Sequence, residues 1–319
     1  MASANANLHK AKCAKNDEFY TQLTDIEKEL MHYKAHFKDK IVLCNCDDPT
    51  WSAFWKYFHL NFAELGLKKL ISTHYDREEA TYKMEYTGGD DNNIEVGIKT
   101  PLEGNGDFRN QECLDLLDEC DIVVTNPPFS LFREYVAVLM EHEKKFLILG
   151  NMNALTYKEI FPLIRDNQLW YGASIHSGDR KFYVPDDYPL KASGCGVDDN
   201  GRKFIRVKGV RWYTNLDYKV RHEKLVLWKN YTPEEYPKYD NYDAINVNKY
   251  SEIPCDYDGV MGVPITFLDK FSPEQFEIVG ISGSLANSIV IDGSRKSGRF
   301  YIDGKRMYDR IVIRKKAGV

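Results

Sequence analysis

The sequence comprises 319 residues, of which 43% are hydrophobic and 29% are charged, and its formal net charge is −5. These values are typical of a globular chain with one large domain or two of ordinary size, and they exclude a disordered chain. No apolar run is long enough to span a membrane, and the seven cysteines include no CxxC pair. We therefore expect no membrane partner, no bound metal and a reducing, cytoplasmic setting.

The first half of the chain alternates between predicted strands and helices. Residues 1–16 are basic and are predicted to form a flexible arm. Apolar, strand-like runs occupy residues 40–45, 68–74, 121–126 and 145–150. Helical patterns occupy residues 26–37, 50–65, 111–119 and 160–165, and a further helix is predicted to start at Ser130. This alternation predicts an α/β fold with a mostly parallel, doubly wound sheet.

The run at residues 121–126 leads directly into the turn Asn126-Pro127-Pro128-Phe129. Two prolines cannot continue a strand, so Asn126 is expected at the carboxyl end of its strand, where α/β sheets bind ligands. The Asn126 amide oxygen and the Pro127 carbonyl would be two fixed acceptors for an amino group, and Phe129 would offer a flat face to a planar ring. The alternative is a rigid turn in which Asn126 only ends the strand.

Residues 82–86 and 94–98, in the first half of the chain, flank a Gly-Gly-Asp sequence and are predicted to form a hairpin. Beyond residue 169, several glycines break the chain into short strands and loops. Residues 211–214 and 224–228 are predicted to close the sheet as antiparallel strands. Five short strands are predicted at residues 263–267, 276–281, 288–291, 299–302 and 310–313. The last of these leads into a basic tail with Lys315 and Lys316, which predicts a surface for phosphate contacts or a solvated terminal face.

Asn126-Pro127-Pro128-Phe129 resembles the catalytic motif of S-adenosylmethionine-dependent amino-methyltransferases, and the whole chain resembles the EcoRI-type adenine-specific modification methylases. The other segments that carry the resemblance are Asp17-Glu18-Phe19-Tyr20-Thr21-Gln22, Cys44-Asn45-Cys46-Asp47-Asp48-Pro49, Gly106-Asp107-Phe108-Arg109, Arg211-Trp212-Tyr213-Thr214-Asn215-Leu216 and Val263-Pro264-Ile265-Thr266-Phe267-Leu268. The resemblance implies a Rossmann-like methyltransferase fold. We expect a catalytic domain at 1–229 and a strand-rich target-recognition region at 230–319.

The resemblance also implies roles for individual residues. Asn126, Pro127, Pro128 and Phe129 would be catalytic. The S-adenosylmethionine site would comprise Phe19, Tyr20, Thr21, Asn45, Cys46, Asp47, Asp76, Asp107 and Phe108. The turn at Asp47 lacks the glycines that are common in the wider superfamily, and Asp47 and Asp48 either bind the cofactor's ammonium group or cap the next helix. Trp212 or Tyr213 would contact the flipped base or would pack in the core, and Lys315 and Lys316 would contact DNA.

These features predict an enzyme that methylates the 6-amino group of a flipped adenine in double-stranded DNA, with a restriction endonuclease for the same site as an expected partner. Two alternatives stay open at this point. One is methylation of an RNA base or of a protein glutamine, because those enzymes share Asn-Pro-Pro-aromatic turns. The other is a DNA-binding relative that has lost catalysis.

Overall fold

The structure is a computed structural model that describes residues 20–46, 48–76, 80–186, 188–190 and 194–317. The chain divides into two compact units, and each is described here by itself. The first comprises Met1–Glu159 and Tyr171–Asp217, and the second comprises Ile160–Trp170 and Tyr218–Val319. The functional division predicted at residues 229 and 230 stays a prediction.

The first unit contains an eight-stranded sheet in the order β4-β3-β2-β1-β5-β6-β11-β7. Its four interior strands run parallel, whereas β3, β4 and β11 pair antiparallel. The strands are β1 (Ile41–Cys44), β2 (Lys69–His74), β3 (Tyr82–Tyr86), β4 (Ile98–Pro101), β5 (Ile122–Thr125), β6 (Lys145–Asn151), β7 (Trp170–Tyr171) and β11 (Val210–Thr214). The prediction of a mixed α/β chain with a large sheet that is parallel at its centre is confirmed.

The parallel strands are apolar because helices cover both of their faces. Every residue of β1 and β5 is buried, as expected of strands between two helical layers. The chain passes from β1 to β2 in one direction along the sheet and from β5 to β6 in the other. The switch point therefore lies between β1 and β5. Crevices at the carboxyl ends of strands around such a point are the usual ligand sites of open α/β sheets.

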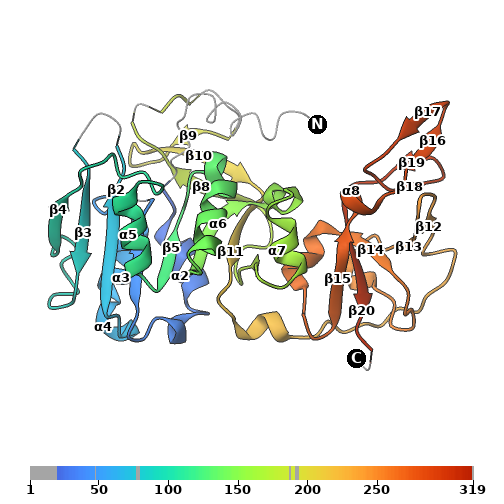
Figure 1. Ribbon diagram of the computed structural model, residues 1–319, viewed down its shortest axis with the longest axis horizontal. Helices are drawn as coiled ribbons and strands as arrows, with labels where there is room; N and C mark the ends of the chain where they lie inside the picture. Colours follow the sequence, from blue (N-terminus) through green and yellow to red (C-terminus); the bar gives the residue numbers. More distant parts are fainter. Residues whose placement is uncertain (1–19, 47, 77–79, 187, 191–193, 318–319) are drawn as a thin grey trace. The chain divides into compact units, whose positions relative to one another are not determined.

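The helices of the first unit pack against this sheet, and α5 and α6 lie on its near face in Figure 1. The helices are α2 (Leu23–Leu30), α3 (Ala53–Leu60), α4 (Phe62–Leu65), α5 (Gln111–Glu119) and α6 (Phe132–Glu141), with 3₁₀ turns at Lys34–His36, Phe129–Leu131 and Met152–Thr156. A further 3₁₀ turn, Lys219–His222, belongs to the second unit. The α5 bounds match the prediction. The cap of α3 is Ser52, whose hydroxyl accepts from the N–H groups of Phe54 and Trp55, and not an aspartate.

Three predictions are wrong in detail. The helix predicted from residue 50 begins at Ala53, so Trp51 precedes α3 and is exposed. Ser130 does not cap α6, because a 3₁₀ turn intervenes and Leu131 holds the cap position. Residues 224–228 form no strand. The N–H and carbonyl of Leu225 bind the side chain of Gln275 instead of a neighbouring strand.

A second, three-stranded sheet in the first unit has the order β8-β10-β9. Its strands are β8 (Asp179–Tyr183), β9 (Gly196–Val197) and β10 (Lys203–Lys208). All of its pairs are antiparallel. The glycines beyond residue 169 predicted short strands and loops in this region, but the sequence did not predict which strands pair.

The second unit is built on a five-stranded sheet in the order β12-β13-β14-β20-β15. Its elements are α7 (Phe161–Arg165), β12 (Lys238–Tyr239), β13 (Tyr242–Asn246), β14 (Met261–Pro264), β15 (Phe276–Ile281), α8 (Ser282–Leu285), β16 (Ile289–Ile291), β17 (Ser294–Lys296), β18 (Tyr301–Ile302), β19 (Lys305–Arg306) and β20 (Arg310–Lys315), with 3₁₀ turns at Tyr250–Glu252 and Ile265–Lys270. The predicted strand at 276–281 matches β15. The strand predicted at 263–267 ends earlier, at Pro264, where a 3₁₀ turn begins.

Candidate active site

Two asparagines end the strands on either side of the switch point. Asn45 follows β1 and Asn126 follows β5. The two strands are hydrogen-bonded neighbours in parallel register, with Val42 opposite Ile122 and Leu43 opposite Val123. Both asparagines are buried. The polar ends of β1 and β5 therefore meet at one edge of the sheet, where the sequence predicted the cofactor turn and the catalytic turn.

In the turn after β5, the side-chain amide of Asn126 is buried and the ring of Phe129 is partly exposed. Asn126 is 7% exposed, whereas Pro128 and Phe129 are half-buried. Phe129 meets the buried Phe182 edge to face, with ring centroids 6.4 Å apart. The turn thus places a buried side-chain amide beside a partly exposed aromatic ring. Its binding of a planar amine stays a prediction.

The turn after β1 is tied to the helix that follows the catalytic turn. The phenol of Tyr135, on α6, donates a hydrogen bond to Oδ1 of Asn45. Burial raises the pKa of Tyr135 well above its ordinary value, so the phenol keeps its proton and remains a donor. Cys46 is partly exposed beside it, and Asp47 lies outside the described residues. Tyr135 was not predicted, because its buried position on α6 is also typical of an ordinary core tyrosine.

Asp48 organises the outer side of this turn. Its Oδ1 accepts from the Tyr82 hydroxyl at 2.8 Å and from the N–H and hydroxyl of Thr50 at 2.9 and 2.8 Å. Its Oδ2 lies 3.2 Å from Nδ1 of His74, at the end of β2. Asp48 therefore joins the ends of β1 and β2. It does not cap α3, whose cap is Ser52, and its contact with the cofactor stays a prediction.

Gly106 brings the next predicted motif up against β2. Its φ is +74°, and a Cβ at this position would lie 2.4 Å from the backbone oxygen of His74. Only glycine fits this approach. The loop also hydrogen-bonds to the chain beyond β2, because the N–H of Asp76 donates to the carbonyl of Asn105 at 3.2 Å. Asp76 and Asp107 are therefore brought to the same edge of the sheet.

Asp107 and Phe108 occupy contrasting surroundings. The carboxylate of Asp107 accepts from the backbone N–H and the guanidinium of Arg109, at 2.7 to 3.0 Å. Asp107, then Glu134, hold the pKa of Arg109 above its ordinary value. Phe108 is buried and meets Tyr135 edge to face at 4.9 Å.

The amino-terminal motif reaches this region through β8. The backbones of Tyr20 and Tyr183 exchange two hydrogen bonds, of 2.9 and 3.1 Å, and the Gln22 amide donates to the Lys181 carbonyl at 2.8 Å. The neighbour of Tyr183 is Phe182, which touches Phe129. The sequence did not predict this pairing, because β8 (DRKFY) shows no alternation of polar and apolar residues. Phe19 lies outside the described residues.

Two hydroxyl groups near these segments stand out. Among the described residues, no hydrogen-bond partner lies within reach of Oγ1 of Thr21 or of Oγ1 of Thr73, although both atoms are buried. A buried hydroxyl without a partner costs about 1 to 3 kcal/mol. Thr21 belongs to the predicted cofactor motif, and Thr73 lies near the carboxyl end of β2. These atoms suit a site that is completed by a polar ligand.

The remaining predicted residues lie elsewhere. Trp212 and Tyr213 are fully buried in β11, against Phe54 and Phe132 respectively. Their placement supports the core alternative, and the contact of either residue with a flipped base stays a prediction. Lys315 and Lys316 belong to the second unit. Lys315 donates to the carbonyl of Cys255, whereas Lys316 is exposed.

No helix in the described part of the chain is both long and apolar enough to cross a membrane. No group of three or more His, Cys, Asp or Glu side chains within the described ranges is arranged to hold a metal ion.

Comparison with known proteins gives a consistent result. A family model described as adenine-specific methyltransferase EcoRI matches residues 7–316. Type II methyltransferase M.EcoRI from Escherichia coli is 48% identical, with 98% of each chain covered. Type II methyltransferase M.MpnI from Mycoplasma pneumoniae is 40% identical, again over 98% of each chain. M.MgeORF184P from Mycoplasma genitalium is 39% identical over 97% of this chain and 99% of its own. No solved structure matches significantly.

Proposed function

Because the chain belongs to the EcoRI family of adenine-specific methyltransferases and is a DNA methyltransferase, we propose that it moves a methyl group from S-adenosylmethionine to the 6-amino group of an adenine that is flipped out of duplex DNA. The observation that carries this proposal is the meeting of two turns at the switch point of the sheet. One turn follows β1 and the other follows β5, and Tyr135 joins them through Asn45. Such a point is where an α/β sheet can hold a methyl donor beside its acceptor.

The catalytic turn is suited to grip an exocyclic amine. The amide oxygen of Asn126 and the carbonyl of Pro127 accept hydrogen bonds, and proline has no N–H to compete for them. Two acceptors on an amine draw its lone pair out of conjugation with the ring and direct it towards the methyl donor. Phe129 holds the base by stacking, and an edge contact with Phe182 supports its ring. Most of the rate enhancement then comes from positioning and electrostatic stabilisation.

The cofactor residues are proposed from the same edge of the sheet. S-adenosylmethionine supplies an activated methyl group on a positively charged sulfur. Asp107 would accept from its adenine amine and Phe108 would pack near its ring, while Thr21 and Asn45 would bind its polar end. The unpartnered hydroxyl of Thr21 supports this fit. The finer assignment also includes Phe19, Tyr20, Cys46, Asp47 and Asp76, with Asp76 as the acceptor for the ribose.

We further propose that the second unit binds the DNA around the target base. The exposed Lys316 is the more available of the two predicted phosphate ligands. Lys315 must first leave the carbonyl of Cys255 and Asp258, 3.6 Å away. The relatives are named as Type II methyltransferases, which supports a restriction endonuclease for the same site as a partner.

The direct test is Asn126→Ala. We expect cofactor binding to persist in calorimetry, while methyl transfer to duplex DNA falls by several orders of magnitude. Asn215→Ala is a matched control, because Asn215 also follows a strand of the sheet and its amide oxygen accepts from the Phe146 N–H at 2.9 Å. That variant should lose stability but keep its turnover. Near-normal methylation by Asn126→Ala would reject the proposed catalytic turn.

A further inference from the structure

The second unit carries two short β-ribbons between β15 and β20. β16 and β17 pair antiparallel through three residue pairs, and β18 and β19 pair through two. Each ribbon reverses at an Asp-Gly pair with positive φ: Asp292-Gly293 at 51° and 72°, and Asp303-Gly304 at 50° and 72°. This is the geometry of the tight turn whose twist matches that of the strands. Figure 1 shows both ribbons projecting beyond the five-stranded sheet.

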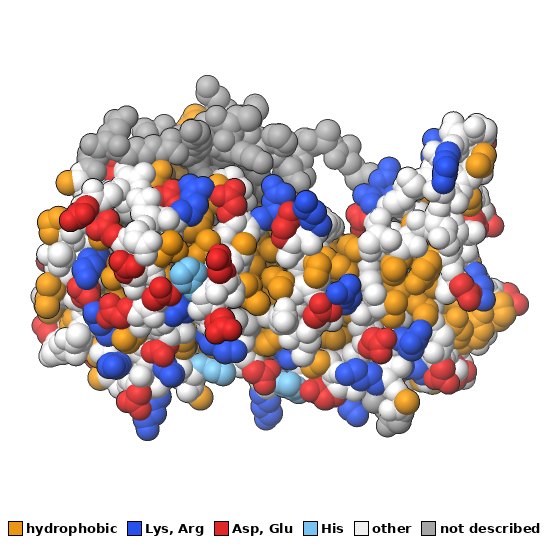
Figure 2. Space-filling view, in the orientation of Figure 1, with side chains coloured by type: hydrophobic (Ala, Val, Ile, Leu, Met, Phe, Trp, Pro, Cys, Tyr) orange, Lys and Arg blue, Asp and Glu red, His pale blue; other side chains and the backbone are white. Residues whose placement is uncertain are grey.

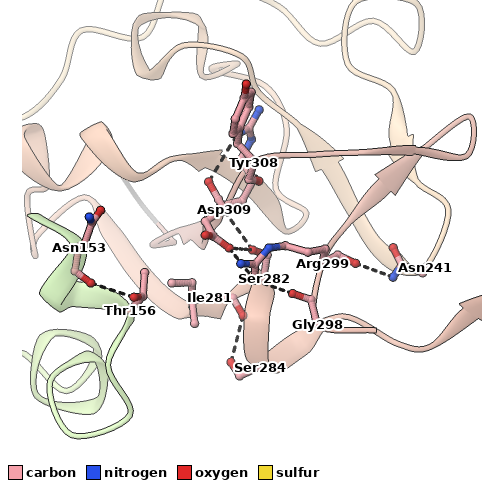
Figure 3. Close-up of polar contacts among 11 residues, drawn as sticks. Asn153, Thr156, Asn241, Ile281, Ser282, Ser284, Gly298, Arg299, Tyr308 and Asp309 are labelled. Carbon is pink, nitrogen blue, oxygen red and sulfur yellow. Dashed lines mark hydrogen bonds and ion pairs between the residues drawn. The ribbon is translucent and has the colours of Figure 1, made fainter. Parts of the chain in front are cut away.

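One buried asparagine holds the bases of both ribbons. The Nδ2 of Asn241 donates to the carbonyl of Asn287, before β16, at 2.7 Å and to that of Arg299, before β18, at 2.9 Å. Its Oδ1 accepts from the N–H of Tyr301 at 3.2 Å. Figure 3 shows Asn241 bound to the Arg299 backbone. The carboxylate of Asp240 next to it accepts from the backbone N–H groups at the tip of the second ribbon.

The segment between the ribbons is anchored by charge and by packing. The guanidinium of Arg299 lies 3.1 Å from the Asp309 carboxylate, which also accepts from the Ser282 hydroxyl (Figure 3). The ring of Phe300 lies between those of Tyr239 and Tyr242, with centroids 4.4 and 5.1 Å away. The ribbons therefore stand on a packed base, as a recognition element needs if its side chains are to be held in place.

The outer parts of the ribbons have the charge and the surface of a DNA-binding element. Residues 289–306 contain five basic and two acidic side chains, a net charge of +3 in a chain of −5. Every residue of β17 and β19 is exposed, and basic side chains are visible at the projecting end in Figure 2. Arg295 pairs across the first ribbon with Val290, which is 69% exposed. A guanidinium and an apolar group thus share one outward face.

We propose that the β16–β17 ribbon enters the major groove of the duplex and reads it through Arg295 and Val290. This inference rests on the proposed function above and assigns the reading element within it. Three residue pairs span about 10 Å, which is enough to reach the floor of a groove about 8.5 Å deep, and a groove about 12 Å wide admits a two-stranded ribbon. An arginine fits the O6 and N7 of guanine, and an apolar side chain fits the methyl of thymine. Lys305 and Arg306 on the second ribbon contact phosphates.

The test compares methylation patterns in cells and rates in vitro. Sequencing methylated adenines in DNA from cells that express the wild type defines its target site. On duplexes with that site, Arg295→Gln should lower kcat/KM by about 5-fold to 150-fold, the range of one good bidentate base contact. The variant should also methylate duplexes in which one base pair of the target site has been replaced. Lys305→Gln should weaken binding to all sequences and lower the salt slope by about one.

The controls separate this inference from the proposed function. Lys249→Gln neutralises an exposed lysine of the same unit outside the ribbons, paired only loosely with Glu252 at 3.6 Å, and should change neither the target nor the rate. Asn126→Ala tests the chemistry alone. An Arg295→Gln enzyme that methylates the wild-type site at the wild-type rate overturns the ribbon proposal while the methyltransferase assignment stands. The ribbon proposal is also overturned if Arg295→Gln loses only its association with a protein partner, while its target site and its methylation rate stay unchanged.

Discussion

The phenol of Tyr135 donates to the side-chain oxygen of Asn45, so the helix behind the catalytic turn holds the residue that ends the first strand. Tyr135 also packs against Phe108. It thus touches two of the residues proposed for the cofactor site, and it belongs to the same helix that Pro127 and Pro128 introduce. A substitution at Tyr135 should therefore weaken cofactor binding.

Tyr135→Phe removes this donor and leaves the buried oxygen of Asn45 to find another partner. We expect a loss of about 1 to 3 kcal/mol in the free energy of unfolding, and weaker cofactor binding in calorimetry. Tyr213→Phe is the matched control, because its buried hydroxyl donates to the carbonyl of Asn151 at 2.9 Å. It should lose comparable stability and keep its cofactor affinity. Equal affinities in the two variants would contradict a positioning role for Tyr135.

Gly106→Ala should displace the Asp107 loop. The added Cβ meets a backbone oxygen of His74 that cannot move aside, and the positive φ adds about 1 to 3 kcal/mol of strain. Gly201→Ala carries similar strain, with φ at +79°, but its Cβ meets nothing within 4 Å. Cofactor affinity should fall in the first variant only, and thermal unfolding should show some loss in both. Unchanged affinity in Gly106→Ala would mean that the loop does not form the site.

Phe129→Ala should weaken docking of the flipped base with little effect on the fold, since the ring is partly exposed and meets Phe182 edge to face. A base stacked on an aromatic side chain gains about 1 to 3 kcal/mol, so kcat/KM should fall by about 5-fold to 150-fold. Phe129→Tyr keeps the flat ring and should restore most of the rate. If the alanine variant matches the wild type in steady-state assays, stacking on this ring plays no part.

Glu29 predicts a specific pH dependence of stability. It is fully buried, and burial raises its pKa although the backbone N–H groups of Ala173 and Ser174 donate to it at 2.7 Å. The folded state therefore keeps this proton to higher pH than the unfolded state does. Stability contributed by Glu29 is full at low pH and is lost as the pH rises through the folded pKa. Urea unfolding from pH 4 upward should show the wild type losing stability relative to Glu29→Gln, and parallel curves would refute this assignment.

The sequence predicted the parallel core and the location of the catalytic turn because both depend on local signals. An apolar run that stops at two prolines can only be a strand end, and the α5 bounds follow from helical spacing. The Tyr135–Asn45 bond joins residues 90 positions apart, and no local pattern marks it. Residues 224–228 were predicted to form a strand from their local pattern, but they do not. Val226 and Trp228 are exposed, and the N–H and carbonyl of Leu225 are hydrogen-bonded to the side chain of Gln275 and not to a neighbouring strand.

Pairing of Tyr20 with Tyr183 has a consequence for the order of events during synthesis. Tyr20 is translated well before Tyr183 and has no partner strand until that residue has left the ribosome. Closing so long a loop is slow compared with forming a helix. The nascent chain can therefore pair its four parallel strands, the last of which ends at Asn151, before it completes the proposed cofactor site. A newly made molecule should gain methyltransferase activity only after this long-range pairing has formed.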